Sequence, residues 1–449
     1  MSVDTVSMTG WGRTAPTTAL RFRPRTYEEA VAAVRGCGPR GSIARGLGRA
    51  YGDAAQNAGG SVLDMTALNR IRSVDTAGGT VVCDAGVSLH RLMHALLPLG
   101  WFVPVTPATR YVTVGGAIGA DIHGRNQHVS GSFSRHVHSL DLLTADGEVR
   151  TVRPGTGLFD ATAGGMGLTG VILSATIGLR PVTTSLMSVT TERATDLDDL
   201  MARLTVGSRR STYTAGWIDL LARGRSTGRA VLTRGEHAPL DALPARARRT
   251  PLAFRPVHLP AVPPYVPEGL LGRASIALYN EVRYRTAPRH RTGELQRIST
   301  FFHPLDGVPH WNRVYGRSGF VQYQFLVGHG REETLRRIVR RISLRRCPSF
   351  QAVLERFGEG DPGWLSFPVP GWSLSLGLPA TLPGLAGFLD ELDEEVASAG
   401  GRVCLAKDSR LRPETLAAMY PRLDEFRALR AEVDPNGAFR SDLSRRLAL

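Results

Sequence analysis

Two glycine-rich segments contain the residues best suited to hold a large ligand. The stretch 44–53 has glycine at positions 46, 48 and 52, and the stretch 114–124 has glycine at positions 115, 116, 119 and 124. Glycine adopts positive φ and lets backbone N–H groups approach a ligand closely, so such turns can surround phosphate oxygens. Two of them favour one ligand with a diphosphate that is bound at two places. A dinucleotide cofactor is the first candidate.

The first of these segments is not a standard dinucleotide fingerprint. Its spacing, Gly46-x-Gly48-xxx-Gly52, differs from G-x-G-x-x-G, and no capped helix follows it directly. Taken alone, it is better explained by an ordinary tight turn. A third glycine-rich run at 164–170 lies in the same region, and the three runs together favour a ligand.

Composition indicates an ordinary globular protein. The chain has 449 residues, of which 42% are hydrophobic and 21% charged, enough for two or three domains. It has no apolar run of about 18 residues, and residues 1–9 lack the pattern of a secretory signal. We therefore expect a cytoplasmic protein. The four cysteines show no metal-binding spacing, and we expect buried thiols with no disulfide and no metal.

The charge balance is strongly basic. Lys and Arg number 55 against 40 Asp and Glu, a net charge of +15. Such a field attracts nucleic acid, anionic lipid or a phosphorylated substrate. The basic residues are spread along the chain and do not alternate with aromatic residues, which argues against nucleic acid. An anionic membrane surface or an anionic substrate is favoured instead.

These segments need a framework of mixed α and β structure. A helix that begins after Thr26, a helix at 89–97 and a hairpin at 137–152 are the clearest elements among many short helices and strands in the first 180 residues. Further strands and an amphipathic helix at 385–399 follow. The stretch 238–267 has eight prolines among several arginines. It cannot build a core, and we predict a mobile loop there.

Longer strings of the sequence resemble the vanillyl-alcohol-oxidase class of FAD proteins, which has a PCMH-type FAD-binding domain. The strings near the glycine turns are RGLGRAYGD (45–53), TVGGAI (113–118), DIHG (121–124) and GLTG (167–170). Further strings are TGWGR (9–13), HPLD (303–306), QYQF (322–325), FPVPGW (367–372) and AKDSR (406–410). The resemblance covers nearly the whole chain, in order.

The resemblance implies an α+β fold of two domains. Residues 1–183 and 402–449 would form the FAD-binding domain, and residues 184–401 a substrate domain with an antiparallel sheet flanked by helices. The implied FAD-binding residues are Arg45, Gly46, Leu47, Gly48, Arg49, Ala50, Tyr51, Thr109, Thr113, Gly115, Gly116, Ile118, His123, Ile172 and Lys407. In many relatives a histidine of the first turn is bonded to the flavin, and Arg49 takes that place here. We therefore expect noncovalent FAD.

The implied chemistry is oxidation of a secondary alcohol, in which a base removes the hydroxyl proton while the carbon's hydrogen leaves as hydride to the flavin. Lys407 is the first candidate for the base, because it is the only lysine in the chain and arginine cannot release a proton at neutral pH. The alternative is a surface or phosphate-contacting lysine. His123 is the second catalytic candidate; a hydrogen-bond donor and a core histidine are its alternatives.

The implied substrate pocket contains Trp11, Gln322, Gln324, Ser375 and Lys407. The two glutamines share one face of a strand at 320–326 and can bind sugar hydroxyls or the flavin edge, or else form an exposed polar face. Trp11 and Trp372 are candidates for the pocket wall, although an aromatic residue is more often simply part of the core.

Three residues depart from the family pattern and bear on substrate identity. Ser375 stands where mycobacterial members have cysteine, Gly377 where the family has an acidic residue, and Phe302 where it has tyrosine.

Within the class, the strings are most similar to actinobacterial oxidases of a decaprenyl-phosphate-linked ribose. This implies oxidation of the 2-hydroxyl of the ribose to a ketone, after which a short-chain reductase forms the arabinose epimer for cell-wall arabinan synthesis. It also implies peripheral binding at the inner face of the plasma membrane, with the stretch 238–267 as lid or membrane contact. An FAD-dependent sugar or polyol oxidase of another pathway is the main alternative, and a flavin-binding protein without chemistry is a third.

Overall fold

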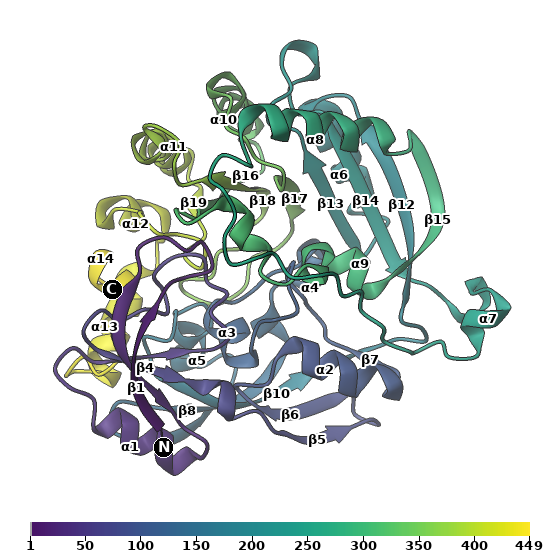
Figure 1. Ribbon diagram of the computed structural model, residues 1–449. Helices are drawn as coiled ribbons and strands as arrows, with labels where there is room; N and C mark the ends of the chain where they lie inside the picture. Colours follow the sequence, from purple (N-terminus) through teal and green to yellow (C-terminus); the bar gives the residue numbers. More distant parts are fainter. Residues whose placement is uncertain (1) are drawn as a thin grey trace.

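The computed structural model describes residues 2–449 and contains two sheet-based regions (Figure 1). The N-terminal region holds a four-stranded sheet in the order β1-β2-β4-β3 and a five-stranded sheet in the order β5-β6-β10-β8-β9. The first consists of β1 (Ser2–Met8), β2 (Thr17–Arg23), β3 (Ser42–Arg45) and β4 (Ser61–Asp64). The second consists of β5 (Ile71–Asp75), β6 (Thr80–Asp84), β8 (Val137–Leu143), β9 (Val149–Val152) and β10 (Val171–Gly178).

Short helices connect these strands. They are α1 (Tyr27–Arg35), α2 (Leu89–Leu96), α3 (Val114–Gly119), α4 (Gln127–Ser130) and α5 (Gly157–Thr162). The hydroxyl of Thr26 accepts a hydrogen bond from the Glu29 amide, and that of Ser88 accepts one from the Arg91 amide. The two predicted helix starts are therefore confirmed, because each cap satisfies an amide that the first turn leaves free.

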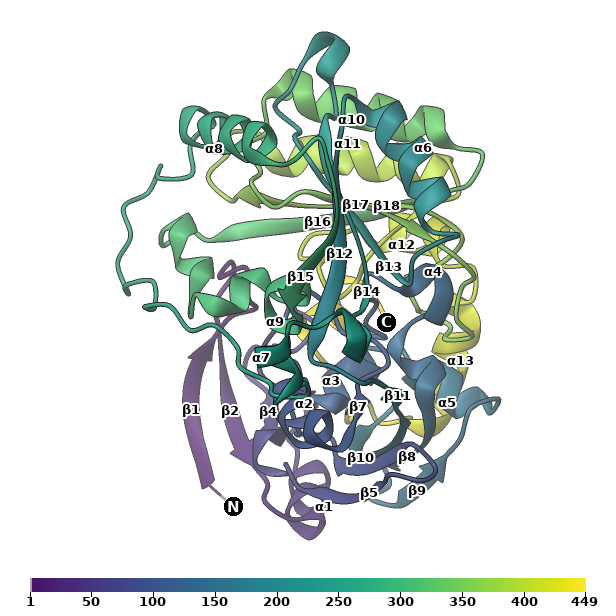
Figure 2. The same ribbon diagram turned by 90° about the vertical axis from the view of Figure 1, so that its right-hand side faces the viewer.

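The second region is an eight-stranded sheet in the order β15-β12-β14-β13-β17-β18-β16-β19, and all its strand pairs are antiparallel. Its strands are β12 (Leu186–Ala194), β13 (Tyr213–Ile218), β14 (Ala230–His237), β15 (His290–Arg297), β16 (Phe320–Gly328), β17 (Val353–Phe357), β18 (Gly371–Pro379) and β19 (Arg402–Val403). One face is packed by α6 (Leu197–Gly207), α10 (Glu332–Arg345) and α11 (Leu385–Ser398). Figure 2 shows these helices and the N-terminal region separated by the sheet.

The remaining elements are short or lie at the edges of the two regions. They are β7 (Trp101–Phe102), β11 (Arg180–Pro181), α7 (Ala245–Arg248), α8 (Arg273–Thr286), α9 (Ile298–Phe302) and the 3-10 turns η1 (Met65–Ala67), η2 (Leu97–Leu99), η3 (Phe133–His136), η4 (Gly224–Ser226), η5 (Leu240–Ala242), η6 (Pro304–Gly307) and η7 (Trp311–Tyr315).

The C-terminal segment returns to the N-terminal region through α12 (Pro413–Met419), α13 (Leu423–Val433) and α14 (Asp442–Arg446). The Arg446 guanidinium lies 2.8 Å from the Asp53 carboxylate. The Tyr51 amide donates to the carbonyl of Ala406, and a Cβ on Gly52 would overlap the Asp408 carbonyl oxygen. The chain around Lys407 is thereby held directly against the first glycine-rich turn.

The proline-rich stretch 238–267 is largely irregular apart from η5 and α7, and it is hydrogen-bonded to the rest of the protein; its mobility stays a prediction. The Ser185 amide donates to the Pro251 carbonyl, and the Leu259 amide donates to the Gly307 carbonyl. Among residues 2–449, no helix has both the length and the apolar composition needed to cross a bilayer. Cys83, Cys347 and Cys404 are buried as expected, whereas Cys37 is only half-buried.

Candidate active site

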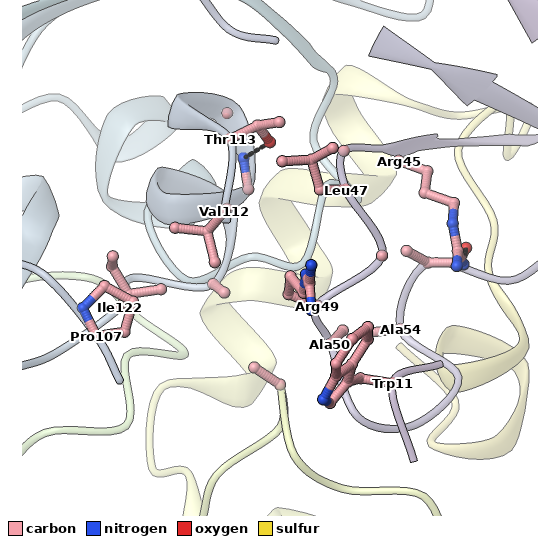
Figure 3. Close-up of a pocket in the computed structure, with 18 of the residues that line it drawn as sticks. Trp11, Arg45, Leu47, Arg49, Ala50, Ala54, Pro107, Val112, Thr113 and Ile122 are labelled. Atoms are coloured by element: carbon pink, nitrogen blue, oxygen red, sulfur yellow. Dashed lines mark hydrogen bonds between the residues drawn. The ribbon is translucent and has the colours of Figure 1, made fainter. Parts of the chain in front are cut away.

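A cavity lies where the first glycine turn, the start of α3 and the segment at Lys407 meet. Figure 3 shows Leu47 beside Thr113 and Arg49 beside the Trp11 ring on its wall. The predicted cofactor residues that line it are Arg45, Gly46, Leu47, Gly48, Arg49, Ala50, Tyr51, Thr109, Thr113, Gly115, Gly116, Ile172 and Lys407. Ile118 and His123 do not line it. Ile118 is a fully buried residue of α3, and His123 lies beyond the wall against the eight-stranded sheet.

The two glycine turns touch each other at Gly46 and Thr113. A Cβ on Gly46 would overlap Thr113 Oγ1 and lie 3.0 Å from its Cγ2 and 3.1 Å from its Cβ. Thr113 Oγ1 in turn accepts a hydrogen bond from the Gly116 amide at 3.2 Å, drawn as a dashed line in Figure 3. Glycine at 46 is therefore required so that the backbone can pass close to the start of α3, which brings the amides of both turns to one cavity.

Two arginines of the first turn have different surroundings. The Arg45 guanidinium donates to the carbonyls of Ala55 (2.9 Å) and Thr9 (2.7 Å), so it braces the turn. The Arg49 guanidinium carbon lies 3.8 Å from the centroid of the Trp11 ring, and its Nε is buried without a hydrogen-bond partner. Burial lowers the pKa of Arg49, while Asp306 raises it. Arg49 is thus a stacked, unpaired cation that suits an anionic ligand group.

Lys407 lines the cavity, so the alternative of a surface lysine is wrong. Burial lowers the pKa of the Lys407 ammonium, whereas the nearby Cys404 and Glu355 raise it. Among residues 2–449, its ammonium makes no hydrogen bond and no ion pair within 4.0 Å. A desolvated, unpaired amine is the state in which a lysine can take up a proton near neutral pH.

His123 lies between α3 and the sheet. Its Nε2 is 3.0 Å from Gln324 Nε2, and because an amide nitrogen only donates, His123 Nε2 is the acceptor. Burial and the Lys407 charge lower the pKa of His123 to about 3, although the Gln324 hydrogen bond raises it. The ring is therefore neutral at physiological pH and carries its proton on Nδ1.

The two predicted glutamines are buried, with exposed fractions of 5% for Gln322 and 1% for Gln324. The alternative of an exposed polar strand face is therefore wrong, because this face of the sheet is turned toward His123 and the N-terminal region. Gln322 Nε2 donates to Ser375 Oγ at 2.9 Å, and Gln324 Nε2 donates to Ser373 Oγ at 2.8 Å. The Oε1 atoms of both glutamines are buried without a partner.

Of the two tryptophans expected to wall the pocket, only Trp11 does so. Trp372 lies in the core on the opposite, helix-covered face of the sheet, where its Nε1 donates to Glu332 at 3.0 Å. The physical reason is strand alternation: Ser373 and Ser375 point to the polar face, so Trp372, which directly precedes Ser373, points to the opposite face.

The other lining residues were not named as site residues from the sequence. They are Ala44, Ala54, Ala55, Met65, Ala85, Pro107, Ala108, Val112, Gly119, Ala120, Ile122, Met166, Gly167, Gly170, Leu305, Trp311, Gln351 and Ala406. Met166, Gly167 and Gly170 belong to the third glycine-rich run, which was a usable signal. The others are mostly small or apolar side chains, whose type carries no chemical signal until the fold brings them together.

Comparisons with known proteins agree with this geometry. The family model for an FAD binding domain matches residues 18–153, and that for D-arabinono-1,4-lactone oxidase matches residues 381–447. The chain is 56% identical over 373 residues to an uncharacterised protein of Streptomyces coelicolor, covering 81% of this chain and 100% of that one. It is 25% identical over 457 residues to alditol oxidase of a Streptomyces species, covering 98% and 99%.

A further relative covers both regions of the fold. The chain is 46% identical over 452 residues to decaprenylphosphoryl-β-D-ribose oxidase of Mycolicibacterium smegmatis, covering 99% of this chain and 98% of that one. The buried unpaired Arg49 and the close turns at Gly46 and Thr113 fit the FAD that these matches imply. The chain belongs to the decaprenylphosphoryl-β-D-ribose oxidase family of FAD-dependent oxidoreductases.

Proposed function

We propose that this protein oxidises the 2-hydroxyl of decaprenylphosphoryl-β-D-ribose to the 2-keto sugar. The observation that carries the proposal is the 46% identity to the M. smegmatis oxidase, because it extends over 99% of the chain and so includes the substrate-domain sheet as well as the FAD region. When bound, FAD supplies the acceptor for the two electrons of the oxidation.

Lys407 is the proposed proton acceptor for the substrate hydroxyl. Its amine lines the cavity without an internal partner, and burial lowers its pKa toward the range in which a neutral amine is populated. His123 is a weak base in this setting because its pKa is about 3. We assign it instead a positioning role, in which the neutral ring donates from Nδ1 while Gln324 fixes its orientation.

The remaining predicted residues hold the two ligands in this proposal. Arg49 and the two glycine turns would bind the cofactor, with Arg45 bracing the first turn. Gln322, Gln324 and Ser375 would bind the sugar, and Trp11 would close the pocket beside Arg49. We propose that FAD is noncovalent, because the described lining residues include no histidine or cysteine that could form the bond.

The proposal includes the division of the chain into an FAD-binding domain at 1–183 and 402–449 and a substrate domain at 184–401. In support, the strands from β12 to β18 all belong to one sheet, and α14 returns to Asp53. The keto product still has to be reduced to give the arabinose epimer. A short-chain reductase is therefore the proposed partner enzyme, which assigns the pair to cell-wall arabinan synthesis.

A decaprenyl-linked substrate requires access to a lipid surface, and we propose that residues 238–286 provide it. Half of the exposed large apolar side chains in the described chain lie there: Leu240, Val257, Leu259, Tyr265, Leu270, Leu278, Tyr279 and Val282. The same segment contains seven arginines, at positions 246, 248, 249, 255, 273, 283 and 285. Apolar side chains that enter the headgroup region next to arginines that bind anionic lipid would give peripheral binding to the inner face of the plasma membrane.

Vesicle binding tests the membrane contact. The variant Leu278→Glu/Val282→Glu on α8 should sediment at least tenfold less with vesicles of phosphatidylglycerol and phosphatidylcholine than the wild type. Leu344→Glu is the matched control, because Leu344 on α10 is 73% exposed but lies outside this segment. Equal binding by all three proteins would contradict the assignment.

Anaerobic flavin reduction tests the proposed activity. Decaprenylphosphoryl ribose should bleach the FAD absorbance of the purified enzyme and yield one equivalent of the 2-keto sugar. The full-length match to alditol oxidase makes an alditol such as xylitol the competing substrate. Bleaching by xylitol but not by the lipid-linked ribose would establish the alternative function.

A further inference from the structure

Glu355 lies on the polar face of the substrate-domain sheet and has no role in the account above. It belongs to β17, and its direct partner on β18 is Ser373. Directly opposed residues of an antiparallel pair point to the same face. Ser373 Oγ accepts a hydrogen bond from the Gln324 side-chain amide, which also donates to His123 Nε2. Glu355 therefore points to the same side of the sheet as the two glutamines.

Three hydrogen-bond acceptors on this face have no partner. Gln322 Oε1 and Gln324 Oε1 are buried and unpaired. Among residues 2–449, the Glu355 carboxyl makes no hydrogen bond and no ion pair within 4.0 Å. Buried unsatisfied acceptors are costly unless a ligand or a water molecule supplies donors. A ligand that satisfies all three must be rich in O–H or N–H groups.

Two cations lie near the Glu355 carboxyl and oppose the effect of its burial. Burial raises the pKa of the Glu355 carboxyl, while Arg125 and Lys407 lower it. Arg125 is held over the Phe301 ring at 4.7 Å, and its carbonyl accepts from the Thr214 amide at 2.9 Å. The two cations are close enough to favour the carboxylate without occupying its oxygens.

We propose that Glu355 is a specificity-determining residue, whose carboxylate accepts a hydrogen bond from a sugar hydroxyl other than the one that is oxidised. The inference rests on the proposed function for the identity of the sugar. Ribose carries two such hydroxyls, at C3 and C5, and each can donate to one of the free acceptors on this face. A phosphate oxygen only accepts at neutral pH, so the same carboxylate repels the phosphate and orients that end of the substrate away from β17.

Flavin reduction by deoxy substrates tests this contact. The half-saturating concentration would be measured for polyprenylphosphoryl ribose and for its 3-deoxy and 5-deoxy analogues, with the wild type, Glu355→Ala and Glu355→Gln. With the full substrate, Glu355→Ala should raise it about 10- to 100-fold, as expected for a lost hydrogen bond to a charged group, and Glu355→Gln should raise it less. With the deoxy analogue that lacks the hydroxyl bound by Glu355, the substitution Glu355→Ala should change the half-saturating concentration by less than about threefold.

Controls separate this outcome from general damage to the site. Glu359→Gln changes an exposed carboxyl four residues further along and should match the wild type with every substrate. Each variant is used only with wild-type FAD content and visible spectrum. An equal effect of Glu355→Ala on all three substrates, or no effect on any, overturns the proposal.

A wrong assignment of the substrate would give a different result from a wrong role for Glu355. In that case the wild type itself is not reduced by polyprenylphosphoryl ribose. The same comparison is then made with the sugar or polyol that does reduce it and with the deoxy forms of that compound. Glu355 can thus be confirmed or rejected as a hydroxyl-binding residue whatever the sugar is.

Discussion

The substitution Gly46→Ala tests whether the two glycine turns act as one cofactor site. The added Cβ would overlap Thr113 Oγ1, and rotation of the Thr113 side chain cannot relieve this, because its Cβ is only 3.1 Å away. Rotation would also withdraw Thr113 Oγ1 from the Gly116 amide, so the cap on α3 is lost, and the Thr113 Cβ still has to shift by a few tenths of an ångström. We expect a loss of about 1 kcal/mol for the cap and roughly 1–3 kcal/mol for the overpacking. Since both turns bind FAD, its affinity should fall at least tenfold, or about 1.4 kcal/mol.

The assay is titration of apoprotein with FAD, followed by flavin fluorescence, together with thermal unfolding of the apoprotein. Gly387→Ala is the matched control: Gly387 lies on α11 with open space around the added methyl group, and the change should stabilise the helix by about 0.5–1 kcal/mol. If Gly46→Ala binds FAD as tightly as the wild type, the close approach of the turns does not matter for the cofactor.

Three further predictions concern the base, the cofactor bond and acid stability. In enzyme reconstituted with FAD, Lys407→Met should slow flavin reduction about 100- to 10,000-fold per bound flavin. In the wild type the rate should rise with pH toward a Lys407 pKa below the usual 10.5 of lysine, as stopped-flow traces would show. Acid precipitation should leave the yellow colour in the supernatant; a yellow pellet would show that Arg49 does not prevent a covalent bond. Burial lowers the pKa of His237 to about 3 in the folded state, below its usual 6.5. As pH falls below about 6.5, His237 takes up a proton in the unfolded state but not in the folded state, so the folded state loses stability. His237→Gln should reduce the slope of unfolding free energy against pH by up to about 1.4 kcal/mol per unit between about pH 6 and 4 in urea titrations, and an unchanged slope would contradict this.

Local chemistry made several elements predictable. Thr26 and Ser88 mark the starts of α1 and α2 because their hydroxyls satisfy free amides of the first turn, which needs no knowledge of the rest of the chain. The β8–β9 hairpin follows in the same way from its turn residues. Alternation along β18 also held information that was not used. With Ser373 and Ser375 on the polar face, Trp372 had to lie on the other face.

Long-range pairing was not predictable from local patterns. β10 lies between β6 and β8, and β17 lies between β13 and β18, although none of these strands carries a residue that specifies its neighbour. For this reason Trp311 and Gln351 were missed as lining residues, and Glu355 was not singled out. Their place in the site depends on which strands pair. That pairing depends on how the apolar side chains of all the strands are buried together on the faces of the sheet.

The three departures from the family pattern have different consequences once the fold is known. Phe302 is buried among aromatic rings, 4.8 Å from the Tyr213 ring centroid and 5.8 Å from that of Phe102, so it acts through packing. Ser375 keeps a polar function, because it accepts the Gln322 amide. Gly377 has the largest effect on space: a Cβ there would lie 2.9 Å from the Tyr315 hydroxyl and 3.1 Å from Gln322 Oε1. The missing side chain leaves that acceptor free. Position 377 has no acidic group, and the Glu355 carboxylate on the same sheet face raises the pKa of Lys407. Substrate preference in this chain should therefore depend on β17 as much as on β18.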